Sequence, residues 1–234
     1  SPLRTACTPA INVVLTAPRP TSKTPSFPFA GAISFRLFTA GNYIMRLSMK
    51  LFREGLGPHA LEVSMAGVKM GDRLLQLRCG NGKMFAAIAA KVGFTGRACA
   101  IDDNSEMCIR GRKAAAKAGV LVEIDHAQYD TLPYEETSFD VVVLWDLLGV
   151  LTPEQRVRCL QQTLRVLRRG GRCVIIERVP RSGLGALLRR PVLDTTYLKS
   201  GGAERALDAE GFKAVRQLAE REGLAFSEGV KPTT

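Results

Sequence analysis

From residue 60 onward, short apolar runs alternate with longer stretches in which apolar residues recur every three or four positions. The short runs predict buried strands, of which RLLQL at 73–77 and FDVVVL at 139–144 are the clearest. The full set of predicted strands is 73–77, 97–101, 120–126, 139–144, 172–177, 214–218 and 224–228. The predicted helices are a short one in ALEVSMAG at 60–67, then 83–92, 105–118, 153–167 and 202–210.

Strands that alternate with helices are typical of βαβ units, in which right-handed crossovers join parallel strands. Strand 139–144 is too apolar for a surface position, as expected of a strand covered on both faces. The last two strands are joined by a short link and therefore pair antiparallel at one edge. We predict an α/β fold: a Rossmann-like, doubly wound, mostly parallel seven-stranded sheet with an antiparallel edge hairpin and helices on both faces.

The charge of the chain is unevenly distributed. The 234 residues carry a net charge of +11, yet residues 1–53 hold seven basic residues and no acidic one. The remaining residues hold 26 basic against 22 acidic residues, a balance of +4. A domain built around nucleic acid would carry its excess charge on the folded body, so nucleic acid is an unlikely partner.

The amino-terminal part divides into two predicted segments ahead of the domain at 67–234. Residues 1–26 are rich in Ser, Thr and Pro, which predicts a disordered or targeting extension. Residues 27–66 combine apolar and basic residues, which predicts a helical cap segment. Its amphipathic helices either pack on the body or lie on a membrane surface. Residues 1–53 are thus predicted to contact a membrane or a protein partner.

The cysteines indicate a reducing environment. Six cysteines are scattered without a CxxC pair, and there are only two histidines. A zinc site or a disulfide framework is therefore not expected, and no metal ligands are assigned. No apolar run reaches the length of a membrane span. We predict an intracellular location, cytoplasmic or organellar (mitochondrial or plastid), with membrane association left open.

Polar and small residues gather where the predicted strands end, which is where open α/β sheets bind ligands. The first strand is followed by a turn containing Gly80 and Gly82, which let the backbone approach a ligand. Asp102 ends the second strand, where a carboxylate accepts hydrogen bonds from ribose hydroxyls. Gln128 and Tyr129 follow the third strand and offer an amide and a ring to an adenine. These features together indicate a nucleoside site.

Three stretches resemble a class I S-adenosylmethionine-dependent methyltransferase of the ubiquinone/menaquinone C-methyltransferase type. They are VKMGDRLLQLRCGNGKMFAAIAAKVGFTGRACAIDDNSEM, LPYEETSFDVVVLWDLLGVL and LRVLRRGGRCVIIERVPRSG. The resemblance implies that S-adenosylmethionine is the cofactor, with its methionine end at the glycine turn and its ribose at Asp102. Asp103, Asn104 and Met107 would then lie by the adenosine.

Three positions depart from the family pattern Asp-x-Gly-Cys-Gly-x-Gly and the residues around it. Gln76 stands at the acidic position that orients the cofactor's ammonium group, Arg78 replaces the first glycine, and Gln128 replaces a frequent Asp. The residues assigned to cofactor binding are Gln76, Arg78, Cys79, Gly80, Asn81, Gly82, Asp102, Asp103, Asn104, Met107, Gln128, Tyr129 and Trp145. The departures leave a second hypothesis open: a methyltransferase-like fold with weakened or lost cofactor binding, acting as a non-catalytic assembly or scaffold subunit.

Asp146 and His126 are the polar residues near the strand ends that could take a proton, so they are the catalytic candidates. Each has a structural alternative: a helix N-cap for Asp146 and an exposed strand-end residue for His126. The predicted acceptor is a small hydrophobic molecule, quinone-like or lipid-like. Residues 27–65 and 181–198 are apolar and basic and are expected to cover its pocket.

Overall fold

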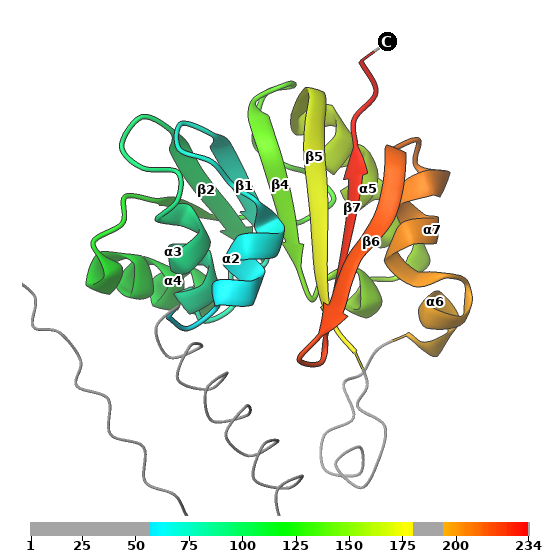
Figure 1. The fold of residues 1–234 in the computed structure, drawn as a ribbon, viewed down its shortest axis with the longest axis horizontal. Helices are drawn as coiled ribbons and strands as arrows, with labels where there is room; N and C mark the ends of the chain where they lie inside the picture. Colours follow the sequence, from blue (N-terminus) through cyan, green and yellow to red (C-terminus); the bar gives the residue numbers. More distant parts are fainter. Residues whose placement is uncertain (1–56, 180–193, 234) are drawn as a thin grey trace, which may run out of the picture. The chain divides into compact units, whose positions relative to one another are not determined.

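A computed structural model describes residues 57–179 and 194–233. Its seven strands form one sheet in the order β3-β2-β1-β4-β5-β7-β6 (Figure 1). The strands are β1 (Arg73–Leu77), β2 (Arg97–Asp102), β3 (Glu123–His126), β4 (Phe139–Trp145), β5 (Leu167–Arg178), β6 (Lys213–Arg221) and β7 (Leu224–Val230). Strands β1 to β5 pair in parallel, whereas β7 pairs antiparallel with β5 and with β6. The predicted fold class is confirmed.

Helices cover both faces of the sheet (Figure 1). The first face packs against α2 (Ala60–Ala66), α3 (Lys83–Ala89) and α4 (Ser105–Ala118). The other face packs against α5 (Pro153–Val166), α6 (Thr195–Lys199) and α7 (Gly202–Ala209). A short 3₁₀ helix, η1 (Leu148–Val150), follows β4. Burial of apolar side chains on both faces explains why the central strands read as continuous apolar runs.

Several element boundaries differ from the sequence-based prediction. Strand β3 begins at Glu123 rather than residue 120, and α3 ends at Ala89 rather than residue 92. The largest difference concerns residues 168–171, which were expected to form a turn after the helix but belong to β5. Lys231 is the cause: its main chain bonds to the N–H of Gly170 and to the carbonyl of Gly171, which extends the pairing with the chain after β7.

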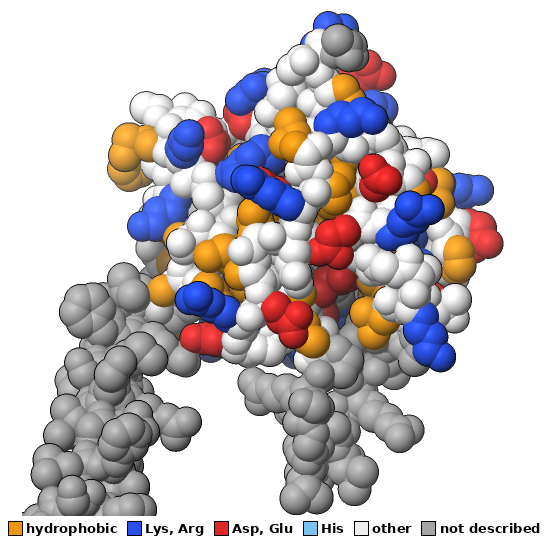
Figure 2. Space-filling view, turned by 45° about the vertical axis from the view of Figure 1, so that its right-hand side comes forward, with side chains coloured by type: hydrophobic (Ala, Val, Ile, Leu, Met, Phe, Trp, Pro, Cys, Tyr) orange, Lys and Arg blue, Asp and Glu red, His pale blue; other side chains and the backbone are white. Residues whose placement is uncertain are grey.

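The predicted extension at 1–26 and most of the predicted cap segment at 27–66 lie outside the described residues, as does most of 181–198. Their roles stay predictions. On the face shown in Figure 2, Lys and Arg side chains are interspersed with Asp and Glu, and hydrophobic side chains occur in several small groups. Among the described helices, none has the length and apolar content needed to cross a membrane.

Candidate functional site

The turn after β1 adopts a sequence of left-handed backbone conformations. Arg78, Gly80 and Gly82 have φ angles of 66°, 54° and 74°. A Cβ at Gly82 would lie 2.4 Å from Cα of Gly111 in α4, so this glycine permits close packing of the turn on a helix. A Cβ at Gly80 would lie 3.8 Å from Nε1 of Trp145 and meet nothing closer. Gly80 is thus the glycine of this turn that leaves space on the ligand side.

Asp102 joins the turn to the end of β2. Its Oδ2 accepts a hydrogen bond from the main-chain N–H of Gly80 at 3.1 Å, and its Oδ1 accepts one from Asn104 at 3.1 Å. The residue is only 2% exposed. A buried carboxylate requires such partners, and these two leave further lone pairs for additional donors. Asp102 therefore links the end of β2 to the turn after β1. Both places were predicted to bind the cofactor.

Several of the assigned residues have local structural roles. The Asn104 side chain caps α4 by accepting from the N–H groups of Glu106 and Met107, and Asn81 Oδ1 accepts from Lys83 at 3.1 Å. Cys79 is buried against α4, where burial raises the pKa of its thiol well above the usual range. These contacts explain why such residue types occur there without invoking a ligand.

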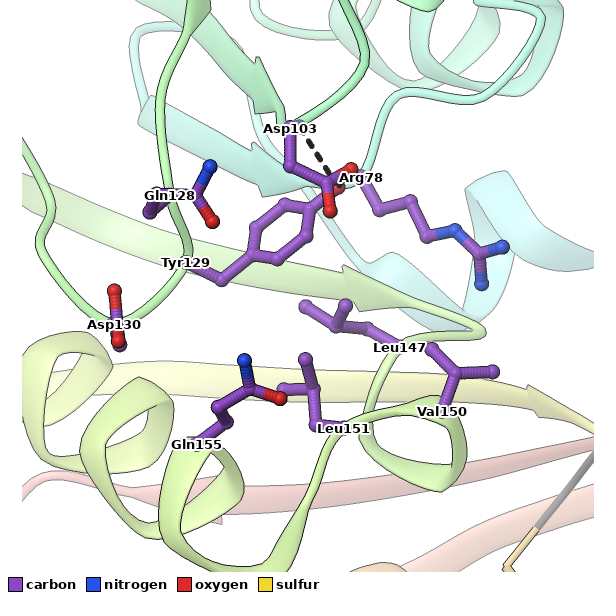
Figure 3. A pocket seen from close by; sticks show the side chains of 9 residues that line it. All are labelled: Arg78, Asp103, Gln128, Tyr129, Asp130, Leu147, Val150, Leu151 and Gln155. Atoms are coloured by element: carbon purple, nitrogen blue, oxygen red, sulfur yellow. Dashed lines mark hydrogen bonds between the residues drawn. The ribbon is translucent and has the colours of Figure 1, made fainter.

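A cavity of about 210 Å³ lies beside the turn (Figure 3). Its lining residues come from the ends of β1 to β4 and from the start of α5: Arg78, Asp103, Gln128, Tyr129, Asp130, Leu147, Val150, Leu151 and Gln155. The Tyr129 hydroxyl donates to Asp103 Oδ1 at 3.0 Å and accepts from the Asp103 N–H at 3.2 Å. Burial raises the pKa of Tyr129, so the hydroxyl stays protonated. Asp103, Gln128 and Tyr129, which were predicted to lie together, do so.

Arg78 turns toward the end of β4. Its Nη1 donates to the main-chain carbonyl of Asp146 and lies 3.7 Å from Asp146 Oδ2. The same carboxylate accepts from Arg178 Nε at 2.8 Å and lies 2.5 Å from Arg178 Nη2. Asp146 is 7% exposed, whereas the Arg178 side chain is 56% exposed. One buried carboxylate is thus shared by two guanidinium groups from neighbouring strand ends.

These contacts bear on the two catalytic candidates. Asp146 is not a helix N-cap, because Leu147 occupies that position of η1 and Asp146 has a φ of 47°. Its carboxylate is paired with Arg78 and Arg178. His126 is exposed at the end of β3, where its Nε2 lies 2.9 Å from the Asp103 carbonyl. Neither residue lines the cavity.

Sequence reasoning missed Glu177 and Tyr197. The carboxyl of Glu177 ends the apolar run of β5 and lies 3.1 and 3.2 Å from the Tyr197 hydroxyl. Desolvation raises the pKa of Glu177 to about 7. The sequence does contain a signal for Glu177, because this acid directly follows the apolar residues of a predicted strand in IIERV. Asp102 was assigned to the site for the same reason. The partner from α6 could be found only in three dimensions.

Comparisons with known proteins agree with this geometry. Residues 74–171 match the family model of the methyltransferase domain. The chain is 31% identical over 121 residues to the ubiquinone/menaquinone biosynthesis C-methyltransferase UbiE of Hydrogenovibrio crunogenus, covering 51% of this chain and 46% of that protein. The UbiE of Salmonella arizonae is 28% identical over 117 residues, with 49% and 46% covered. The chain therefore spans about half the length of these relatives.

A solved structure of an S-adenosylmethionine-dependent methyltransferase from Aquifex aeolicus shares the fold, with a TM-score of 0.62, 18% identity, and 75% and 90% of the two chains covered. Residues 74–171 thus match the methyltransferase domain, and the chain shares the fold of an S-adenosylmethionine-dependent methyltransferase, a class whose cofactor is S-adenosylmethionine. Within that class, the matched domain is similar to the UbiE C-methyltransferases. The resemblance drawn from the sequence is confirmed.

The residues at the strand ends fit this cofactor. Gln76 is fully buried at the start of the turn, and within the described residues its Oε1 accepts no hydrogen bond, while its Nε2 donates to the Arg78 carbonyl at 3.2 Å. An unpaired buried acceptor suits a ligand donor such as an ammonium group. The Arg78 guanidinium, which stands where the family pattern has its first glycine, donates to the main-chain carbonyl of Asp146. Asp102, Asp103 and Tyr129 would hold the adenosine part.

Proposed function

We propose that this protein transfers a methyl group from S-adenosylmethionine to a small hydrophobic acceptor of the quinone type. The observation that carries the proposal is the position of Asp102, which binds the N–H groups of both Gly80 and Asn104 beside the cavity of Asp103 and Tyr129. This arrangement presents a carboxylate, a phenol and a glycine turn to one ligand. The bound cofactor supplies an activated methyl group, so the protein's task is alignment and exclusion of water.

The cavity wall supports an apolar acceptor. Leu147, Val150 and Leu151 form the side of the cavity that belongs to the end of β4 and to η1 (Figure 3). Val150 is 49% exposed, so an apolar ligand placed there would cover surface that now faces solvent. The names of the relatives include ubiquinone and menaquinone biosynthesis, which supports the quinone class for this chain as a proposal.

Calorimetric titration with S-adenosylmethionine and S-adenosylhomocysteine tests cofactor binding directly. We expect micromolar binding of both. Transfer of a labelled methyl group to hydroxylated benzoquinols and naphthoquinols then tests the acceptor class, with a catechol and a basic peptide as control acceptors. Binding with transfer only to the control acceptors would refute the quinone part. No binding up to millimolar concentration would refute the enzyme and favour the non-catalytic scaffold, which the comparisons do not support.

We further propose that residues 1–53 bring the enzyme to an anionic membrane or to a protein partner. The support is their composition, seven basic residues and no acidic one, because such segments are attracted to anionic lipid headgroups. Flotation with vesicles of neutral lipid, and with vesicles containing phosphatidylserine, tests this. Flotation that does not depend on anionic lipid, or that is unchanged when residues 1–53 are removed, would contradict the membrane proposal.

A further inference from the structure

Arg78 belongs to the same cavity as the apolar residues assigned above to the acceptor. It lines the cavity together with Leu147 and Val150. Its Nη1 donates to the main-chain carbonyl of Asp146, the residue that directly precedes Leu147. Figure 3 shows the guanidinium on the side of the cavity away from Gln128. The cation is therefore held at the end of β4, where the apolar wall begins.

The charge of this guanidinium is only partly balanced by its neighbours. Within the described residues, the carboxylate in ion-pair contact with Arg78 is that of Asp146, whose Oδ2 lies 3.7 Å from Nη1. The same oxygen lies closer to Arg178, at 2.5 Å from its Nη2. Two guanidinium groups thus share one carboxylate, which leaves a net positive charge. The Arg78 side chain is 33% exposed, so this charge is accessible to a ligand in the cavity.

The Arg78 guanidinium also has an edge with available donors. In the part of the chain that the structure describes, Nη1 makes a hydrogen bond, whereas Nε and Nη2 make none. These two nitrogens lie on one edge of the guanidinium plane, and parallel donors on such an edge match the two oxygens of a carboxylate. Backbone geometry does not explain the arginine, because its φ of 66° is one that glycine adopts more readily.

Acidic side chains in the cavity determine where an anion can bind. Asp103 and Asp130 also line it. The Asp103 carboxylate accepts a hydrogen bond from the Tyr129 hydroxyl, and Figure 3 shows Asp130 on the opposite side of the cavity from the Arg78 guanidinium. These carboxylates repel an anion, whereas Arg78 attracts one. The cavity is therefore suited to a ligand that carries its negative charge at the Arg78 end.

We propose that Arg78 selects the methyl acceptor by binding an anionic group on it, a carboxylate or a similar planar oxyanion. This inference rests on the proposed function and defines the acceptor more narrowly. Its apolar ring lies against Leu147 and Val150, and its acidic substituent binds Nε and Nη2 of Arg78. The guanidinium takes no part in making or breaking bonds; it fixes the orientation of the acceptor. The bound anion also reduces the repulsion between Arg78 and a positively charged cofactor.

Two acceptors that differ in charge test the proposal in the full-length protein. One is a naphthoquinol with a carboxylate substituent, and the other is the same naphthoquinol with a carboxamide in its place. For the wild type we expect kcat/KM to be at least about tenfold higher for the carboxylate. Arg78→Met should abolish this preference, whereas Arg78→Lys, which keeps the cation, should retain part of it. Each of these side chains places a Cβ on the same left-handed backbone, so backbone strain is matched.

Arg178→Met is the matched control for the loss of a guanidinium. Arg178 binds the same carboxylate of Asp146 but does not line the cavity. Its replacement should therefore leave the preference for the carboxylate acceptor in place. Loss of the preference in Arg178→Met as well would show that the pairing of Asp146, rather than the Arg78 cation, governs acceptor choice. That result would overturn the proposal.

The methionine end of the cofactor carries a carboxylate too, and binding measurements separate the two sources of the anion. Calorimetry compares S-adenosylmethionine with its decarboxylated analogue. We expect Arg78→Met to bind both at least as tightly as the wild type does. Weaker binding of S-adenosylmethionine alone would assign Arg78 to the cofactor and overturn the proposal. Titration of the two naphthoquinols into protein saturated with S-adenosylhomocysteine should show the preference for the carboxylate as a ratio of Kd values.

Failure of this inference and failure of the proposed function give different results. If the wild type methylates both naphthoquinols equally well, the inference is wrong while the proposed function stands. If Arg78→Met lowers kcat/KM for both by the same factor, Arg78 only maintains the structure of the turn, and the inference is also wrong. If the wild type binds no S-adenosylmethionine, the proposed function fails, and the inference fails with it.

Discussion

The guanidinium of Arg78 donates a hydrogen bond to the main-chain carbonyl of Asp146, although the two residues are 68 positions apart in the chain. Both residues have a left-handed backbone, with φ angles of 66° and 47°. Such conformations are unfavourable for residues other than glycine and persist where the surrounding structure enforces them. The contact directs the guanidinium toward the end of β4, while Arg78 still lines the cavity beside the turn, at a position where the family pattern has a glycine.

Arg78→Gly should therefore strengthen cofactor binding. Glycine adopts the left-handed conformation without strain and opens the ligand side of the turn. We expect a roughly 3- to 10-fold lower Kd for S-adenosylmethionine by calorimetry, and more when Gln76→Asp restores the acid. Thr137→Gly is the control, because Thr137 also has a left-handed backbone, with φ 57°, but does not line the cavity. No gain in affinity from the double change would contradict our view of this turn.

Asp102→Asn should loosen the contact between the turn and β2. An amide can accept from only one of the two N–H groups that now bind Asp102, and it turns its own N–H groups toward the other. We expect a loss of about 1–3 kcal/mol in the free energy of unfolding and at least tenfold weaker binding of S-adenosylmethionine. Denaturant unfolding and calorimetry measure the two effects. Unchanged affinity would exclude Asp102 as a cofactor ligand.

Gly82→Ala should be far more costly than Gly119→Ala. Both glycines have a left-handed backbone, with φ 74° and 68°, but only Gly82 faces a neighbour at 2.4 Å, the Cα of Gly111. Gly119 has nothing within 4 Å of an added Cβ, so its replacement costs conformational strain alone, about 1 kcal/mol. For Gly82→Ala we expect more than about 3 kcal/mol, because backbone must move. Equal losses in the free energy of unfolding by urea would show that α3 and α4 can move apart at little cost.

The stability of the fold should depend on the ionisation of Glu177. Its pKa is about 7 in the folded protein against the usual 4.5, so the stabilising contribution is complete below pH 4.5 and is lost as the pH rises through 7. Relative to Glu177→Gln, the wild type should lose about 3 kcal/mol of unfolding free energy between pH 4.5 and pH 8. Unfolding at several pH values measures this difference. A constant difference across that range would show that the pKa of Glu177 is not raised.

The alternation of apolar runs and helical spacing was enough to predict the sheet. Strands that are buried on both faces consist largely of apolar residues, so they can be recognised in the sequence. The prediction was wrong at β5, where residues 168–171 extend the strand instead of forming a turn. Pairing with the chain after β7, more than fifty residues away, supplies the hydrogen bonds there, and no local pattern records it. Helix ends such as that of α3 are likewise decided by packing as much as by propensity.

The site shows the same division. The sequence alone determined that Gly80, Asp102, Asp103 and Tyr129 stand at strand ends, because parallel strands bring their carboxyl ends to one edge. Only the tertiary structure decided that Asp146 serves as a counter-ion and that Glu177 stays close to half protonated. Charge pairing and desolvation depend on which side chains meet, such as Arg78 with Asp146 and Tyr197 with Glu177. These meetings are set by the packing of distant elements, which local spacing does not encode.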